Sequence, residues 1–146
     1  MKNRLTGIIT LVSNVENQHM NSVFQLLKNY NINDPASTGV VIFNNMEMQS
    51  IYYDLIAQSD ISLLEDLKVG DKIEDLSLNE NRTTKINLFS VYSLLKCGAK
   101  NHLESFHNQV LINNGEYSPK FISQEDFDAI VNSFNEKCVS NLKNKY

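Results

Sequence analysis

The strongest constraint on the fold of this chain is a regular seam near its start. Its positions step by 4, 3, 4, 3 and 4 residues and are Val12, Glu16, His19, Val23, Leu26 and Tyr30. This spacing is typical of a helix that packs one face into a bundle. An acid and a histidine one turn apart are therefore expected inside, where each needs a charge or hydrogen-bond partner. Glu-x-x-His facing a bundle interior is how di-iron and di-manganese proteins present two ligands from one helix.

The same spacing recurs in the second half of the chain, at Leu88, Tyr92, Leu95, Ala99, His102 and Phe106. It predicts the longest helix, from about residue 85 to 113, with Thr83 or Thr84 as its cap and Asn114-Gly115 as its end. A shorter seam carries Leu63, Leu67, Gly70 and Glu74. Together these patterns predict an all-α protein.

Capping signals and turns fix the remaining helix boundaries. The predicted helices cover about residues 5–29, three turns after Asn45, 62–76, 85–113 and 123–143. The chain has 146 residues, which suits one domain, 1–146, with its core over 5–113 and an additional C-terminal helix over 123–143.

Composition excludes several functional classes. The net charge is -4 and the 13 basic residues are scattered, so no nucleic-acid partner is expected. No segment approaches the ~20 apolar residues of a membrane helix, so no membrane partner is expected either. The basic and apolar start, residues 1–12, is too short and diluted for a secretory signal, which favours a cytoplasmic location.

Three further expectations concern the cysteine, acidic and histidine side chains. Cys97 and Cys138 form no CxxC pair, and we expect both to be free thiols. The acidic residues between Glu65 and Glu80 are expected to form mostly a solvated helix face. His107 lies beside the second seam and is expected to be half exposed rather than a ligand.

A series of short motifs extends over most of the chain. In order they are Glu16-Asn17-Gln18-His19-Met20, Leu26-Leu27-Lys28-Asn29-Tyr30, Asp34-Pro35, Tyr52-Tyr53-Asp54-Leu55, Val69-Gly70, Ile73-Glu74, Asn101-His102-Leu103 and Tyr117-Ser118-Pro119. The series resembles the ferritin-like family of bacterial and archaeal proteins catalogued as domain of unknown function 2202, over about residues 9 to 131. That resemblance implies a ferritin-like antiparallel helical bundle.

The resemblance also implies a vacant position in the bundle. In the family a glutamate-rich helix precedes the helix that carries Glu16 and His19, and this chain begins after it. We therefore expect a bundle that lacks its first helix. A homo-oligomer, or a partner helix in the vacant position, would cover the apolar surface left open.

The resemblance further implies a metal-ligand set, which consists of Glu16, His19, Glu74 and His102. Two carboxylates and two imidazoles suit Fe, Mn or Zn. The set is incomplete for a dinuclear site, because Ala99 occupies the position three before His102 and removes a second Glu-x-x-His. Ser77 also stands where the family usually has Asp. We therefore expect a mononuclear site if a metal binds.

Two functions of different classes remain open. The first is a metal-binding protein with weak oxidase or peroxide-scavenging activity, by analogy with other ferritin-like proteins. The second is a non-catalytic helical interaction module in which the same four residues form a metal-free, hydrogen-bonded polar core. The sequence has no nucleophile elbow, P-loop or dinucleotide fingerprint, so it leaves open whether the protein is an enzyme and whether it holds any cofactor.

Overall fold

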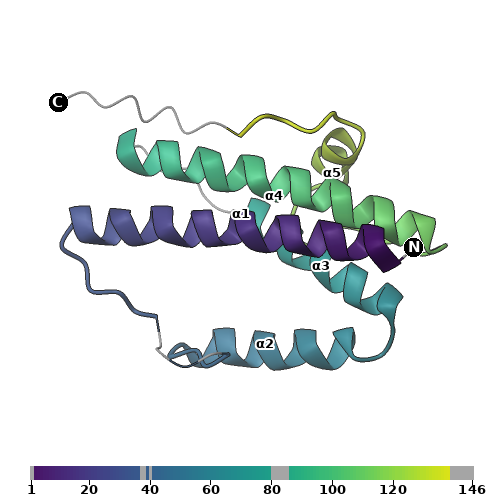
Figure 1. Cartoon of the computed structure of the whole chain (residues 1–146), viewed down its shortest axis with the longest axis horizontal. Helices are drawn as coiled ribbons and strands as arrows, with labels where there is room; N and C mark the ends of the chain where they lie inside the picture. The colour runs from purple at the N-terminus through teal and green to yellow at the C-terminus, as the bar shows by residue number, and fades with distance from the viewer. Residues whose placement is uncertain (1, 37–38, 40, 80–85, 139–146) are drawn as a thin grey trace.

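Helices make up nearly all of the regular structure. The computed structural model describes residues 2–36, 39, 41–79 and 86–138. In chain order its helices are α1 Lys2–Asn29, α2 Met46–Ser59, α3 Leu63–Leu78, α4 Ile86–Ile112 and α5 Gln124–Val131 (Figure 1). The described residues contain no strand, which confirms the predicted all-α class.

Short polar residues begin three of these helices, as the sequence predicts. The Asn45 side chain accepts hydrogen bonds from two N–H groups in the first turn of α2, at 2.9 and 3.1 Å. The hydroxyls of Ser62 and Ser123 each accept one, at 3.2 and 3.1 Å, at the starts of α3 and α5. These caps satisfy amides that have no partner within the helix. The predicted caps Thr83 and Thr84 lie outside the described residues.

Two asparagines end the two long helices. Asn31 follows α1 and Asn114 follows α4, with φ of 53° and 57°, in the left-handed region that asparagine tolerates. The amide of the next residue then returns to a carbonyl five residues back, at 2.9 Å in both cases. This local geometry explains why the predicted ends, 29 and 113, lie within one residue of the observed ends.

Helix α4 is the central element. It packs against α1, α3 and α5, whereas α2 packs on α3 and lies apart from α1 (Figure 1). The buried core joins Leu78 of α3, Ala99 and Leu103 of α4, and Phe127 of α5. The contact between α3 and α4 is close, because a Cβ on Gly70 would lie 2.6 Å from the Phe106 ring. The candidate ligands on α1 and α3 are therefore held against α4, which carries the remaining one.

The C-terminal helix is shorter than predicted. It ends at Val131, and the described residues beyond it, up to 138, are not helical. Phe134, which continues the apolar spacing of the helix, is 95% exposed rather than packed on the core. The predicted range 123–143 is therefore wrong over its described second half. The reason is a contact distant in sequence, which draws this segment along α4.

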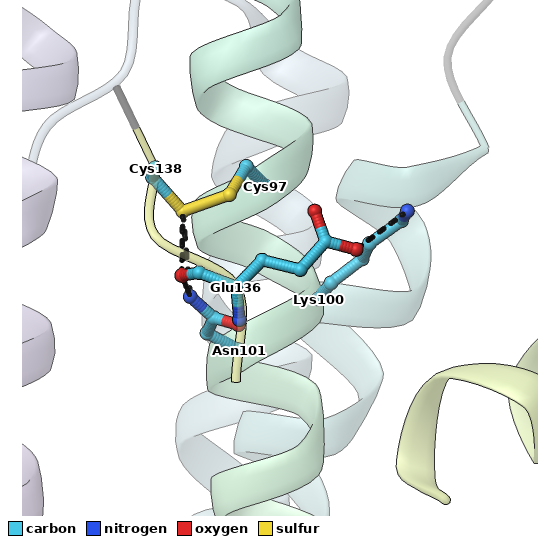
Figure 2. Close-up of a disulfide and its surroundings, with 5 residues drawn as sticks. All are labelled: Cys97, Lys100, Asn101, Glu136 and Cys138. Atoms are coloured by element: carbon cyan, nitrogen blue, oxygen red, sulfur yellow. Dashed lines mark hydrogen bonds and ion pairs between the residues drawn. A yellow bond between two sulfur atoms is a disulfide. The ribbon is translucent and has the colours of Figure 1, made fainter. Parts of the chain in front are cut away.

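That contact is a disulfide, so the prediction of free thiols is also wrong. Cys97 of α4 and Cys138 are bonded across a sequence separation of 41 residues (Figure 2). Asn101, one turn after Cys97, donates to the carbonyl of Glu136 and accepts from its N–H, both at 2.9 Å. No local spacing signals such a pairing, because it arises only when the chain after α5 returns along α4.

Within the described residues, no helix combines the length and apolar character that a membrane crossing requires.

Candidate metal centre

The first two candidate ligands lie one turn apart on α1. His19 is buried, whereas the Glu16 side chain keeps 47% of its surface exposed. The His19 Nδ1 atom lies 3.2 Å from the Glu16 carboxylate. The seam spacing of α1 thus directs both residues to the same side of the helix, toward α4.

The other two candidates approach from α3 and α4. Glu74 and His102 are both buried, and the His102 Nδ1 atom lies 3.2 Å from a Glu74 carboxylate oxygen. The same nitrogen lies 3.2 Å from Glu16. One imidazole nitrogen therefore sits between two carboxylates that come from two other helices.

Three of the four predicted residues meet at one point. Glu16, Glu74 and His102 each offer a ligand atom, and these atoms lie within 4.8 Å of one another. His19 stands one step farther away, because it contacts Glu16 and its ring centroid lies 6.3 Å from that of His102. The geometry thus gives a three-residue centre with His19 adjacent to it.

Electrostatics in the cluster favour the ionised forms of Glu16 and His102. Its hydrogen bonds to His102 and then His19 lower the pKa of Glu16 to about 2. Burial alone would lower the pKa of His102, but the bonds to Glu16 and Glu74 outweigh it and raise that pKa to about 9. Burial raises the pKa of Glu74, and the hydrogen bond to His102 partly offsets this effect. At neutral pH the metal-free cluster is thus held together by a protonated His102.

Gly98 of α4 provides the space for the His19 ring. A Cβ at position 98 would lie 2.3 Å from His19 Cε1 and 2.7 Å from Nε2, closer than real contacts allow. Only glycine leaves the helix backbone open enough for the imidazole to lie against it. The position of the His19 ring therefore depends on the absence of a side chain at position 98.

Gly98→Ala should consequently displace His19 and destabilise the protein. Helix propensity alone would favour alanine by about 0.5–1 kcal/mol, whereas overpacking costs about 1–3 kcal/mol, so we expect a net loss of stability. Urea denaturation measures that loss, and the imidazole resonances of His19 should shift in an NMR spectrum. A variant of greater stability with unchanged His19 resonances would show that the ring does not depend on Gly98.

The donor set can be compared with what metals require. Two carboxylates and neutral imidazoles are ligands that suit Fe, Mn and Zn. Ala99 is buried at the position where a second Glu-x-x-His would carry its acid. Ser77 is exposed and its hydroxyl donates to the Ile73 carbonyl at 2.9 Å, so it adds no ligand. The residues present therefore fit one ion better than two.

Sequence reasoning missed a second buried acidic group on α3. Asp71 and Asp75 are fully buried, so the expectation of a solvated acidic face is wrong for them. A signal was present, because Leu67, Asp71, Glu74 and Leu78 are spaced 4, 3 and 4 residues apart. That spacing places acidic residues on the same helical stripe as buried leucines.

Asp75 is an anchor for the chain between α4 and α5. Its carboxylate accepts a hydrogen bond from the Tyr117 hydroxyl at 2.9 Å and from the Ile122 N–H at 2.9 Å. The N–H groups of Lys120 and Phe121 also donate to it. Burial raises the pKa of Tyr117, and its hydrogen bond to Asp75 raises that pKa further. One acid thus satisfies three backbone amides and fixes the segment that carries α5 onto the core.

Asp71 has a different environment. Neither of its oxygens has a hydrogen-bond partner among the described residues, and His107 Nδ1 lies 3.8 Å away, beyond hydrogen-bonding distance. Burial lowers the pKa of His107, whose ring meets Phe127 edge-on at 4.9 Å between centroids. Only 13% of the His107 side chain is exposed, so it is more buried than the predicted half-exposed histidine.

Comparison with known proteins places the chain in a family. The family described as "Uncharacterized protein domain (DUF2202)" matches residues 3–134. "Uncharacterized protein MJ0754" of Methanocaldococcus jannaschii is 32% identical over 132 residues, covering 86% of this chain and 71% of the relative. The crystal structure of hypothetical protein MJ0754 from Methanococcus jannaschii is similar with a TM-score of 0.85 at 32% identity, covering 89% of this chain and 78% of that one. On these matches, the chain belongs to the DUF2202 family.

Proposed function

We propose that this protein is a ferritin-like metal-binding protein in which Glu16, His19, Glu74 and His102 hold a single Fe, Mn or Zn ion. The observation that carries the proposal is the convergence of ligand atoms from three different helices within 4.8 Å. Weak oxidase or peroxide-scavenging activity belongs to the proposal by fold-level analogy. An exposed edge at Glu16 would let a small oxidant approach such an ion.

Proton competition sets the pH range of this function. Imidazole binds metals only when it is neutral, and the pKa of His102 is about 9 in the metal-free cluster. A metal ion must therefore displace the proton that Glu16 and Glu74 stabilise. We expect affinity to fall as the pH drops from 9 toward neutral, and further where Glu74 takes up a proton.

The contacts of His102 with Glu16 and Glu74 also suit the alternative, a helical interaction module with a metal-free polar core. His102 Nδ1 lies 3.2 Å from both carboxylates, so both acids have a polar partner without a metal ion. The alternative predicts a stable protein with no metal content. Elemental analysis of protein purified without chelators or metal-affinity resin separates the two, since our proposal expects about one metal ion per chain.

Replacing His19 with alanine tests the site by a second route. A metal that binds only the folded state stabilises it by RT ln(1 + [L]/Kd), or about 2.7 kcal/mol at a hundredfold excess over Kd. Wild type should therefore show a higher melting temperature with Fe(II), Mn(II) or Zn(II), and His19→Ala should show a smaller increase. His107→Ala is the matched control, because His107 lies with Phe127 outside the cluster. Identical responses of wild type and His19→Ala would favour the interaction module.

Self-association is part of the proposal. A groove of about 1070 Å³ runs between α1 and the loop before α2. Its α1 wall presents partly exposed apolar side chains at helical spacing, namely Met20, Val23, Phe24 and Leu27. We propose that a helix of a second copy covers this face.

Sedimentation should show a dimer or larger, and Phe24→Asp should shift the protein toward the monomer. A wild-type monomer at high micromolar concentration would contradict this.

A further inference from the structure

A cavity adjoins the two candidate histidines between α1, α4 and the stretch after α5. Its volume is about 340 Å³, and its lining includes His19, Gly98, His102, Glu136 and Cys138. The last two belong to the stretch after α5, residues 132–138, which we call the strap. One end of a disulfide therefore lines the same cavity as two imidazoles.

Few contacts besides the disulfide hold the strap on α4. The Asn101 amide pairs with the backbone of Glu136 through two hydrogen bonds of 2.9 Å, and Lys100 Nζ lies 3.6 Å from the exposed Glu136 carboxylate (Figure 2). Residues 132–137 are exposed, and Phe134 makes no core contact. Exposed ion pairs contribute little, so the bond between Cys97 and Cys138 is the principal fastening of the strap.

The surroundings of the disulfide favour Cys138 Sγ as the sulfur that leaves when the bond is cleaved. Asn101 Nδ2 donates to Cys138 Sγ at 3.3 Å, so it stabilises negative charge that develops on that sulfur. Both cysteines are only partly buried, which leaves the bond open to small thiols. In the cytoplasmic location that the sequence predicts, disulfides are usually transient and catalytic or redox-sensing.

We propose that Cys97 and Cys138 form a reversible redox couple for dithiol reductants, and that reduction frees the strap and opens the His19/His102 cavity. A thiolate of the reductant attacks Cys97 Sγ, the S–S bond breaks, and its electron pair passes to Cys138 Sγ as a thiolate beside Asn101. The second thiol of the reductant then attacks the mixed disulfide and releases Cys97. Two electrons enter the protein and the reductant leaves as a disulfide. This device works with or without a metal.

The test uses the whole chain, freed of metal by a chelator, and the probe is diethyl pyrocarbonate, which modifies neutral imidazole. Protein is equilibrated with mixtures of reduced and oxidised dithiothreitol, free thiols are trapped with a maleimide, and histidine modification is mapped by mass spectrometry. Reduction should accelerate modification of His19 several-fold, and reoxidation should reverse it. His107, which lies against Phe127 away from the strap, should keep its rate.

A double variant, Cys97→Ser with Cys138→Ser, separates this device from a general loss of structure. Its circular dichroism should match that of wild type, and its His19 should react at the reduced-state rate whether or not dithiothreitol is present. Equal His19 rates in oxidised and reduced wild type would overturn the proposal. So would an equal acceleration of His107, which would indicate loosening of the whole domain, or a disulfide that resists dithiothreitol while the protein stays folded.

Discussion

Replacing Asp75 with asparagine should lower the free energy of unfolding by about 3 kcal/mol, the scale on which a buried, hydrogen-bonded charge loses its interactions. Asp75 accepts hydrogen bonds from the Tyr117 hydroxyl and from three consecutive backbone amides. An asparagine keeps one acceptor oxygen and turns an NH₂ group toward these donors, so some of the amides lose their partner. The segment from residue 117 to 122, and α5 beyond it, should loosen first.

Urea denaturation measures the loss, and hydrogen exchange locates it. Asp54→Asn is the control, because Asp54 is exposed on α2 and the same change there should alter stability by less than about 0.5 kcal/mol. Equal stabilities of the two variants would show that Asp75 does not anchor the segment. Exchange that stays unchanged at residues 120–122 in Asp75→Asn would lead to the same conclusion.

Replacing Asp71 with asparagine should have the opposite effect near neutral pH. Burial, then the charges of Asp75 and Glu74, raises the pKa of Asp71 from its usual 3.8 to about 8. Between these values the folded protein holds a proton that the unfolded chain has lost. The stability contributed by Asp71 is therefore complete below about pH 4 and is lost as the pH rises toward 8, by up to about 1.4 kcal/mol per pH unit.

Asparagine does not ionise, so the variant should lack this slope. Its stability relative to that of wild type should therefore rise with pH, by up to about 3.5 kcal/mol between about pH 5 and about pH 7.5, since the wild-type cost accumulates over this range. Urea denaturation across this range provides the measurement. Parallel stability curves for wild type and Asp71→Asn would mean that Asp71 does not titrate in this window.

The local parts of the fold could be predicted because helix periodicity and capping are encoded in neighbouring residues. The spacing of the seams around Glu16 and His102 predicted the two long helices and the burial of His19 and His102, whereas the Glu16 side chain stays half exposed. Asn45, Ser62 and Ser123 mark helix starts by the same local logic. Such signals act within one or two turns, so no knowledge of the tertiary structure is needed to interpret them.

Apart from the burial of Asp71, which its helical spacing indicates, the missed parts depend on segments distant in sequence. Asp75 is buried only because residues 117–122 fold over it, more than 40 residues later in the chain. The disulfide forms because the chain after α5 turns back along α4, and this return also ends the helix at Val131 although the apolar spacing continues to Phe134. Gly98 gives no sign in the sequence that an imidazole from α1 will lie against it.

Our central proposal is that Glu16, His19, Glu74 and His102 hold one metal ion, at the point where the ligand atoms of Glu16, Glu74 and His102 converge. Its most direct test is anomalous diffraction at the zinc edge from crystals grown with Zn(II) at about pH 8, where proton competition at His102 is moderate. We predict one anomalous peak within bonding distance of Glu16, Glu74 and His102. Crystals with no peak at this position, while zinc occupies other surface sites, would contradict the claim and leave the metal-free interaction module.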